Sequence, residues 1–377
     1  MKVVVVGAGI MGLSAAWALH RLGHEVSVFE QGPVPNPRGA SFDQHRLIRY
    51  PYGAAVGYTA MVVEAYRAWD AMWADLGERH YVPTGTLAMC VGDTRWVAAS
   101  AEALQALGLS VDWLAPAQLK ARFPLLTSEG ISGAFHSDTG GVLLADRILG
   151  SLARHLAARG VSVVPHSKVL EVDPWAAAVT LSERRIVAGD ALIVAAGAWG
   201  RWLVPGLAAR VKPSRQVVVY LDPPSNRAAA WAAHPLILDI GEDAGFYLVP
   251  PVAGTGLKVG DHRFTLTGDP DDPRDPSAEE AEAVFATCRN RLAGFDGYRM
   301  ASARVCYYAV EPEERFVLEF FDRAWVMAAC SGHAFKFGPV LGRRLAEAID
   351  GRREPAEVTR WAAGEPPTRF DSVGRRP

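Results

Sequence analysis

The fold of this chain is decided near its start, where the run KVVVV at residues 2–6 is followed at once by GAGIMG at residues 7–12. A continuous β-branched apolar run is typical of a parallel strand that is buried on both faces. Apolar residues then recur at helical spacing, and Gly23 provides a helix stop. A second apolar run, HEVSVF at residues 24–29, ends at Glu30. The pattern predicts a strand, a helix and a second strand, the first unit of a Rossmann-type fold.

The spacing of the glycines and the acid predicts the ligand of this unit. Gly7 permits the tight turn, Gly9 lets the backbone approach a pyrophosphate, and Gly12 lets the helix pack close to the strand. The helix N-terminus then directs free N–H groups and a positive dipole at the anion. Glu30 can accept hydrogen bonds from both ribose hydroxyls and would repel a 2′-phosphate. We therefore expect FAD or NAD here, the alternative being a glycine-rich turn without a ligand.

Composition narrows the class of protein. The chain has 377 residues, half of them hydrophobic, and a net charge of −2. It is long enough for two domains or one large one. Because basic and acidic residues are mixed throughout, we expect no nucleic-acid partner and no polybasic membrane surface. The fold begins at Lys2, which leaves no room for a signal peptide, and no apolar run is long enough to span a bilayer.

Four cysteines show neither metal-ligand spacing nor the density of a disulfide framework. We therefore expect no metal site and a reducing, cytoplasmic environment. The four are Cys90, Cys288, Cys306 and Cys330.

Further strand signals predict an α/β fold in which a Rossmann-type nucleotide-binding domain is interleaved with a β-sheet substrate domain. Strands are expected at 160–164, 168–172, 215–220, 245–250, 256–260 and 303–308, a strand followed by a turn at 191–199, and helices at 278–292 and 339–350. The nucleotide domain is assigned to 1–80, 145–212 and 313–377, and the substrate domain to 81–144 and 213–312. Residues 268–277 are predicted as an exposed loop and 364–377 as a loose tail.

Five motifs in the same order and spacing give this chain a resemblance to a known family. They are GAGIMG with Glu30, DQHRLIRYPYG at 43–53, GLKVGDH at 256–262, VCYY at 305–308 and SGHAFKF at 331–337. The chain resembles the flavin-dependent amine oxidases of the monomeric sarcosine oxidase and N-methyltryptophan oxidase family. The resemblance extends over nearly the whole chain, and the last motif is its most specific part.

The resemblance implies an oxidase that binds FAD in an extended pose, with the flavin tethered covalently through Cys306. Substrates in this family are secondary or N-substituted amino acids, which lose hydride to the flavin, and the imine then hydrolyses while O₂ becomes H₂O₂. On residue chemistry alone, Cys306 is predicted to be a buried structural cysteine, and Cys330 is a second candidate for the tether.

A monomer is expected. By resemblance the cofactor contacts Gly7, Gly9, Ile10, Met11, Gly12, Glu30, Gln31, Arg46, Val169, Gly197, Cys306, Gly332, His333 and Lys336.

Two charged residues stand in apolar or aromatic surroundings and need a partner. Arg49 follows Leu47-Ile48, and Lys336 lies between Phe335 and Phe337. A substrate carboxylate is a suitable partner, since Arg can bind it with two parallel hydrogen bonds and Lys adds a point charge. The alternative is a salt bridge to an internal acid. The resemblance assigns both residues to a carboxylate clamp.

The remaining site residues follow from the resemblance. The resemblance places Lys258 near the flavin, where a fixed cation favours reduction of O₂. The alternative is a solvent-facing lysine, because Lys258 alternates with apolar neighbours on a strand. His262, Tyr308 and Tyr247 match substrate-side positions, although each alone reads as core or rim. Arg46 matches a family position beside the flavin. The alternative is that Arg46 forms a salt bridge on the protein surface.

This sequence departs from the family pattern at three places. Ser41-Phe42 replace a usual His pair, Tyr50 replaces a usual His, and Ala334 replaces a usual Gly. The first two bear on which amine is preferred. An Ala at positive φ would cost roughly 1 kcal/mol or more, so we expect an ordinary φ at Ala334.

Three other functions remain open at this stage. An FAD-dependent dehydrogenase would use another electron acceptor, and Lys258 argues against it. A non-catalytic flavin-binding protein would not need Arg49, Lys336, Lys258 and Cys306 together. An NAD dehydrogenase is disfavoured by the C-terminal flavin motif.

Overall fold

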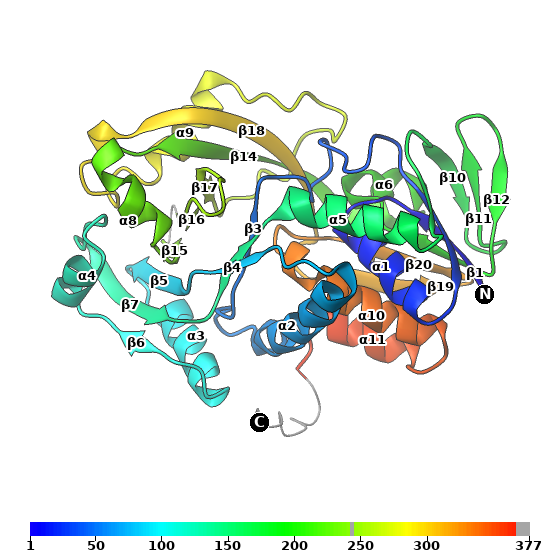
Figure 1. Cartoon of the computed structure of the whole chain (residues 1–377), viewed down its shortest axis with the longest axis horizontal. Coiled ribbons are helices and arrows are strands. Elements are labelled where there is room, and N and C mark those ends of the chain that lie inside the picture. The colour runs from blue at the N-terminus through cyan, green and yellow to red at the C-terminus, as the bar shows by residue number, and fades with distance from the viewer. Residues whose placement is uncertain (242–244, 367–377) are drawn as a thin grey trace.

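The computed structural model describes residues 1–241 and 245–366. Two large sheets lie side by side along the long axis of the molecule (Figure 1). The predicted tail falls mostly on residues 367–377, which lie outside the described residues. In the described part of the chain, no helix combines the length and the apolar character that crossing a membrane requires.

A six-stranded sheet carries the nucleotide-binding unit. Its order is β19-β20-β13-β1-β2-β9, and all neighbours pair in parallel except β19 with β20. The strands are β1 (Lys2–Val6), β2 (Glu25–Phe29), β9 (Ser162–Val164), β13 (Ala191–Val194), β19 (Val317–Phe321) and β20 (Ala324–Ala328). The predicted strand, helix and second strand are confirmed, and Gly23 lies just beyond the helix at a positive φ of 83°.

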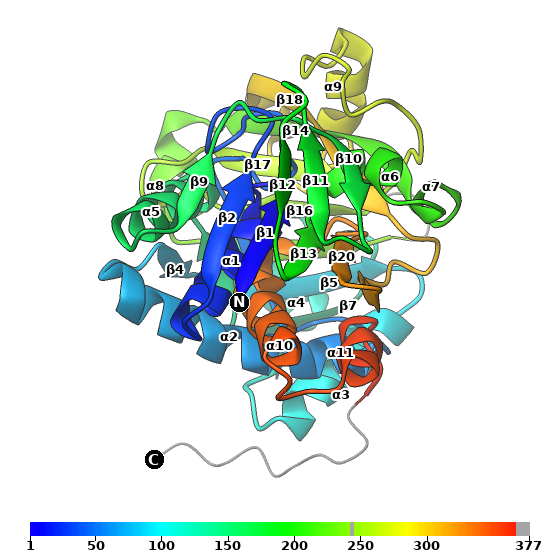
Figure 2. The same ribbon diagram turned by 90° about the vertical axis from the view of Figure 1, so that its right-hand side faces the viewer.

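Both faces of this sheet are covered, as the unbroken valine run predicts. Val3 and Val5 pack with helices, whereas Val4 and Val6 pack with a small three-stranded sheet on the other face (Figure 2). The helices are α1 (Ile10–Arg21), α2 (Val56–Leu76), α5 (Ala145–Ala158), α10 (Gly338–Ile349) and α11 (Pro355–Ala362). The small sheet is β10 (Val169–Asp173), β11 (Ala178–Leu181) and β12 (Ile186–Ala188).

An eight-stranded, mainly antiparallel sheet forms the other half of the molecule. Its order is β18-β14-β17-β16-β15-β5-β7-β6. The strands are β5 (Thr86–Val91), β6 (Asp112–Trp113), β7 (Ile131–Ser137), β14 (Lys212–Asp222), β15 (Leu236–Ile240), β16 (Phe246–Val249), β17 (Leu257–Asp261) and β18 (Arg299–Val310). The predicted hairpin is confirmed, because β16 and β17 pair in antiparallel fashion. Helices α3 (Arg95–Ala106), α4 (Pro116–Arg122), α8 (Ala228–Ala232) and α9 (Ala278–Ala286) flank it.

A second small sheet joins the two halves. It pairs β8 (Gly141–Leu143) with both β3 (Arg46–Ile48) and β4 (Tyr81–Pro83). The segment that carries Arg46 and Arg49 is thereby held at the junction of the two large sheets. Two short helices, α6 (Gly200–Leu203) and α7 (Leu207–Arg210), complete the fold. The strands of the two large sheets come from the two sets of segments assigned above, and we keep those domain limits as a proposal.

One predicted helix is shorter than expected. Ser277 begins α9 with a capping box shared with Glu280, but the helix ends at Ala286 and not at residue 292. Thr287 donates its hydroxyl to the Val284 carbonyl at 2.7 Å, and the Cys288 thiol lies 3.1 Å from the Phe285 carbonyl. These side-chain bonds compete for the carbonyls that the next helical turn would need.

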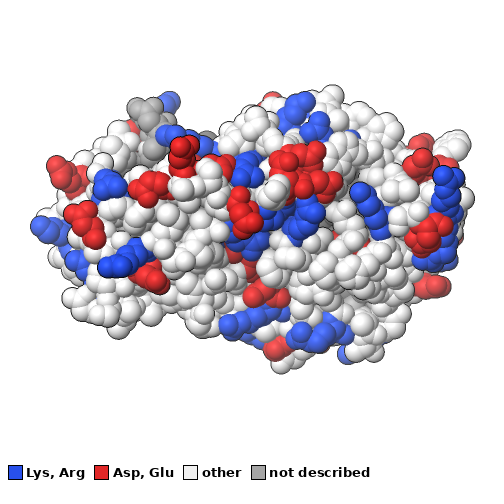
Figure 3. All heavy atoms as spheres, turned by 90° about the horizontal axis from the view of Figure 1, so that it is seen from above, with Lys and Arg blue, Asp and Glu red and all other residues white. Residues whose placement is uncertain are grey.

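The face seen from above mixes acidic and basic side chains, without a field of one sign (Figure 3). This distribution agrees with the mixed charges of the sequence. The expectation that no nucleic acid binds stays a prediction.

Candidate active site

A single cavity of about 890 Å³ runs from the glycine-rich turn to the junction between the two large sheets. Every residue assigned to the site from the sequence lines this cavity, except Gly12 and Cys306. Those that line it are Gly7, Gly9, Ile10, Met11, Glu30, Gln31, Arg46, Arg49, Val169, Gly197, Tyr247, Lys258, His262, Tyr308, Gly332, His333 and Lys336. Residues from opposite ends of the chain are thus brought together.

Two glycines at the nucleotide end, Gly7 and Gly12, have the local geometry expected of a tight turn and of close helix packing. Gly7 has a φ of 101°, and a Cβ atom there would lie 2.5 Å from the Ala195 carbonyl oxygen. A Cβ atom at Gly12 would lie 1.9 Å from the Gly7 carbonyl oxygen, so only glycine lets α1 start this close to the strand. Gly12 therefore shapes the turn without lining the cavity.

Glu30 is buried and organises the loop beside this turn. Its carboxylate accepts hydrogen bonds from the amides of Ala8 at 2.8 Å and Gly32 at 3.1 Å, and from the Asn36 side chain at 2.8 Å. A carboxylate offers about four lone-pair sites, so that capacity remains for a ribose hydroxyl. The sequence reasoning missed Asn36, which also lines the cavity.

Ser41 has a clear local role, although it stands where the family usually has histidine. Its hydroxyl accepts a hydrogen bond from the Ile10 amide at 3.0 Å, at the first turn of α1. It thereby satisfies one of the free N–H groups at the helix start. Gly9, Ile10 and Met11 still face the cavity, where the helix dipole favours an anion.

Lys258 and Arg46 form a paired cationic group on one wall. Both share the buried carboxylate of Asp43, from which the Lys258 ammonium lies 2.6 Å away, and Arg46 also donates to the Ala40 carbonyl at 2.8 Å. A solvent-facing Lys258 is therefore wrong, since its side chain is 2% exposed. A surface salt bridge for Arg46 is wrong as well, because Asp43 is buried. Asp43 was quoted in a motif but given no role.

Arg49 and Lys336 form a second cationic group, and it has no carboxylate of its own. Among residues 1–241 and 245–366, no acidic side chain lies within 4 Å of either charge. The Arg49 Nε and Nη1 atoms are buried without a hydrogen-bond partner in this part of the chain, and its guanidinium stacks 4.2 Å from the Tyr52 ring centroid. Lys336 donates to the Tyr52 hydroxyl at 2.9 Å and to the His333 carbonyl at 2.8 Å. Within the described residues, neither charge forms the internal salt bridge that was the alternative.

This arrangement leaves Lys336 electrostatically strained. Burial, and then the nearby Arg49 charge, hold the pKa of the Lys336 ammonium well below its usual range. An anion placed between the two cations would attract both charges and so offset the cost of burial and of their mutual repulsion. Tyr52, which links the two residues, was not assigned a role from the sequence.

The three predicted substrate-side residues surround the same space. The phenols of Tyr247 and Tyr308 are close enough to interact, and burial raises the pKa of each. His262 is open to the cavity but deeply enclosed by protein, so burial, and then the charge of Arg49, lower its pKa to about 4. All three side chains are consequently neutral at pH 7.

His333 and its neighbours form a rigid corner. The His333 ring lies between the Tyr52 hydroxyl and the Glu314 carbonyl, at 3.2 and 3.0 Å. Burial, and then Lys336, lower its pKa to about 3, so the ring is neutral. Gly332 has a φ of 74°, whereas Ala334 has a φ of −80°. The expectation of an ordinary φ at Ala334 is confirmed.

The two cysteines near the flavin motif differ in position. Cys306 lies on β18, two residues before Tyr308, and its side chain therefore shares a face with that cavity residue. Its sulfur packs 3.9 Å from the Ala40 carbonyl, and burial raises the pKa of the thiol. Cys306 does not itself line the cavity, whereas Cys330 does.

With this geometry in place, the class of protein follows. The sequence profile of the FAD dependent oxidoreductase (DAO) family matches residues 2–348, and this chain belongs to that family. The glycine turn at Gly7 and Gly12, the first turn of α1 facing the cavity and the acid at Glu30 fit the ADP part of FAD. The predicted fold class and the prediction of an FAD-dependent oxidoreductase are confirmed.

Two relatives are similar to this chain over nearly its whole length. Monomeric sarcosine oxidase from Arthrobacter sp. (strain TE1826) is 26% identical over 364 residues, which cover 93% of each chain. N-methyl-L-tryptophan oxidase from Salmonella enteritidis PT4 (strain P125109) is 27% identical over 365 residues, covering 94% of this chain and 96% of that enzyme. The predicted resemblance to this family is confirmed.

A solved structure supports the fold. The open form of NikD, described as an unusual amino acid oxidase essential for nikkomycin biosynthesis, matches with a TM-score of 0.81. The match covers 96% of both chains at 20% identity. At that identity the likeness shows a shared fold.

Proposed function

We propose that this protein is an FAD-dependent oxidase of a secondary or N-substituted amino acid, such as an N-substituted glycine or a cyclic imino acid, with O₂ as electron acceptor and H₂O₂ as product. One observation carries the proposal: the buried Lys336 and the half-buried Arg49, two of whose nitrogens are buried without a partner, lie together in the cavity with no acidic side chain within 4 Å in the described chain. Buried charges need a counter-charge. A substrate carboxylate supplies it.

The residues at the two ends of the cavity would bind different parts of the reactants. Gly7, Gly9, the first turn of α1 and Glu30 would hold the nucleotide part of FAD, with Gln31, Val169 and Gly197 along its path. When bound, FAD supplies the two-electron chemistry by which a C–H bond next to nitrogen is oxidised. Arg49 and Lys336 would fix the substrate carboxylate and so orient the amine.

Neutral groups surround the position of the amine. Because the pKa of His262 is about 4, this ring carries no charge at neutral pH and can accept a hydrogen bond from the substrate nitrogen. Tyr247 and Tyr308 add two phenol groups whose raised pKa values keep them protonated. Such surroundings favour the uncharged amine, which is the form that can give up hydride.

The relatives support the same substrate class. Two enzymes that are 26–27% identical over nearly the whole chain are named for the oxidation of sarcosine and of N-methyl-L-tryptophan. Both of these substrates are N-methylated amino acids with a free carboxylate. The changes at Ser41, Phe42 and Tyr50 leave room for a different amine in this protein.

We further propose that FAD is tethered through Cys306, by a bond whose formation removes one hydrogen from each partner and passes both to O₂. Its support is the motif match and the shared strand face with Tyr308. Acid denaturation should leave the flavin on the chain, and mass spectrometry should find it on the peptide that carries Cys306. Complete release of FAD, or attachment to Cys330, would contradict the tether without touching the proposed reaction.

The proposed reaction is tested by an H₂O₂-coupled screen of the FAD-loaded protein. Sarcosine, N-methyl amino acids, iminodiacetate, proline and pipecolate are compared with their amides or methyl esters. We expect at least one free acid to be oxidised far faster than its amide. Rapid reduction of the flavin by amine without O₂ uptake would instead indicate a dehydrogenase, and no anaerobic bleaching by any amine would indicate a non-catalytic flavin protein.

We also propose that the protein acts as a monomer in the cytoplasm, with a small amino acid and O₂ as its partners. Sedimentation of the FAD-loaded protein would test its oligomeric state directly.

A further inference from the structure

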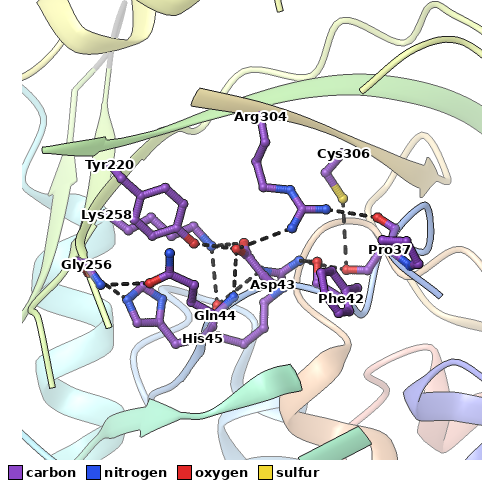
Figure 4. Close-up of polar contacts among 12 residues, drawn as sticks. Pro37, Phe42, Asp43, Gln44, His45, Tyr220, Gly256, Lys258, Arg304 and Cys306 are labelled. Carbon is purple, nitrogen blue, oxygen red and sulfur yellow. Dashed lines mark hydrogen bonds and ion pairs between the residues drawn. The ribbon is translucent and has the colours of Figure 1, made fainter. Parts of the chain in front are cut away.

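Asp43 lies at the centre of a buried polar cluster on one wall of the cavity (Figure 4). Its carboxylate accepts hydrogen bonds from the Lys258 ammonium at 2.6 Å, from the Arg46 guanidinium and from the Tyr220 hydroxyl. Arg304 adds a third cation at 3.8 Å. One carboxylate thus serves three basic side chains.

The backbone around Asp43 is fixed to the strand that carries Lys258. The Gln44 side chain accepts a hydrogen bond from the Gly256 amide at 2.8 Å, and the His45 ring lies 3.0 Å from the Gly256 carbonyl. These contacts hold the segment at the beginning of β17, two residues before Lys258. The distance between the carboxylate and the ammonium is therefore set by the fold and not by flexible side chains alone.

Asp43 stays ionised in this position. Burial opposes its charge, but the Lys258 and Arg46 charges outweigh burial and hold the pKa of the Asp43 carboxyl well below its usual range. At any pH near neutral, the carboxylate is therefore a permanent negative charge beside Lys258.

Lys258, in contrast, has a charge that depends on its neighbours. The pKa of its ammonium is lowered to about 8: burial and the repulsion of Arg46 lower it, and the attraction of Asp43 opposes them. The other groups that face Lys258 are the Cys306 thiol, the Tyr247 ring at 5.9 Å and the neutral His45, whose carbonyl lies 3.3 Å from the ammonium. Asp43 is thus the carboxylate that keeps Lys258 protonated.

We propose that Asp43 is a positioning residue that fixes the Lys258 ammonium at the cavity wall in its charged form, so that the rate of oxygen reduction depends on Asp43. The inference rests on the proposed oxidase function. In that reaction, two electrons and two protons pass from reduced FAD to O₂, which leaves as H₂O₂. Lys258 would stabilise the negative charge that develops on oxygen, and neither residue is consumed.

The test compares Asp43→Asn with wild type in the FAD-loaded protein. Asparagine keeps the size and one oxygen acceptor but removes the charge. Without that charge the Lys258 pKa should fall, so reoxidation by O₂ at pH 8 should slow by about fivefold for the first unit of pKa lost and by about tenfold for each further unit. The rate should return toward wild type as the pH is lowered, whereas anaerobic reduction by substrate should change little.

A second readout is independent of activity. The Lys258 Nζ signal in lysine-¹⁵N-labelled, FAD-loaded protein, assigned with Lys258→Met, should titrate at lower pH in Asp43→Asn than in wild type. The matched control is Asp239→Asn, which breaks the buried Asp239–Arg291 pair, 2.7 Å apart, without touching a cavity-lining side chain. This control should leave the Lys258 titration and the pH profile of reoxidation unchanged.

Two results would overturn the proposal. Faster reoxidation in Asp43→Asn at all pH values would make Asp43 a brake on Lys258, and an unchanged Lys258 titration would remove its electrostatic role. Failure of the proposed function looks different: wild-type reduced protein would then fail to react with O₂ at any pH.

Discussion

Two groups of cations line the same cavity, but they are neutralised in different ways. One is the paired group, Lys258 and Arg46, and the other is the unpaired group, Arg49 and Lys336. The first two share Asp43 and are held by a network inside the protein. The second two share the phenol of Tyr52 and have no acid within 4 Å in the described chain. A cation that is paired inside the protein needs no ligand to balance its charge, whereas the charge of an unpaired cation is balanced only when an anion binds.

This difference separates two kinds of electrostatic task. The paired group presents a fixed potential to whatever reacts beside it, because its geometry is already determined. The unpaired group stores unfavourable energy that a carboxylate releases, which favours function at the expense of stability. The first task suits charge that develops during a reaction, and the second suits charge that arrives with a substrate.

The largest effect is expected from Arg49→Met, which removes half of the unpaired group. Loss of one partner of a buried charge pair costs about 3–5 kcal/mol, so kcat/KM for the free amino acid should fall by about 10²–10³ or more. The amide of the same substrate should lose far less. Steady-state rates for acid and amide give the comparison.

The same variant also tests stability. Because Arg49 has buried nitrogens without partners, its removal should leave the Tm of the protein, measured without substrate, unchanged or higher. Asp43→Asn, which breaks the paired group, should lower it. A large loss of Tm in Arg49→Met would show that this side chain is paired after all, and the contrast between the two groups would fail.

The next largest effect is expected from Lys258→Met, which removes a fixed charge from the paired group while keeping side-chain length. Reoxidation of reduced flavin by O₂ should slow on the order of 10², the effect of losing one preorganised charge at a reacting oxygen. Reduction by substrate should change much less. Stopped-flow measurement of both half-reactions decides, and equal losses would assign Lys258 a structural or substrate-binding role.

A smaller effect is expected from pH, acting on Lys336. Its folded pKa is depressed, and only the protonated form attracts a carboxylate. Binding of methoxyacetate, an unreactive carboxylate, should therefore weaken as the pH rises through this pKa, by at most tenfold per pH unit. Flavin absorbance reports the Kd. In Lys336→Met, binding should be weak at every pH and lose this dependence.

Some parts of the fold and of the site could be predicted from the sequence, and others could not. The β1-α1-β2 unit was predictable because its period, glycines and terminal acid all agree. Arg49 and Lys336 were each predictable as residues that need a partner, because they stand in apolar surroundings. Only the family motifs predicted that they lie together. The paired group was predicted only in part, since Asp43 is far from Lys258 in sequence and nothing local indicates that they touch.

Other misses have the same physical origin. Lys258 alternates with apolar neighbours, a pattern shared by solvent-facing and cavity-facing lysines alike. Asn36 and Tyr52 carry no motif of their own, and their roles come from contacts with Glu30 and Lys336 that only the fold creates. The end of α9 at Ala286 depends on side-chain bonds that the apolar period does not reveal. Long-range pairing, more than local propensity, limits the prediction.

The smallest effect on catalysis is expected from Tyr220→Phe, which removes one hydroxyl donor from Asp43 and leaves both cations in place. Hydrogen bonds to charged groups contribute about 1.5–3 kcal/mol, so the free energy of unfolding should fall by about that amount. Reoxidation should slow only slightly, because Lys258 and Arg46 still neutralise the carboxylate. Denaturant unfolding and stopped-flow oxidation measure the two quantities. If Tyr220→Phe slowed reoxidation as strongly as Lys258→Met, the hydroxyl itself would be part of the oxygen site, and the paired group would owe its effect to more than two cations and one carboxylate.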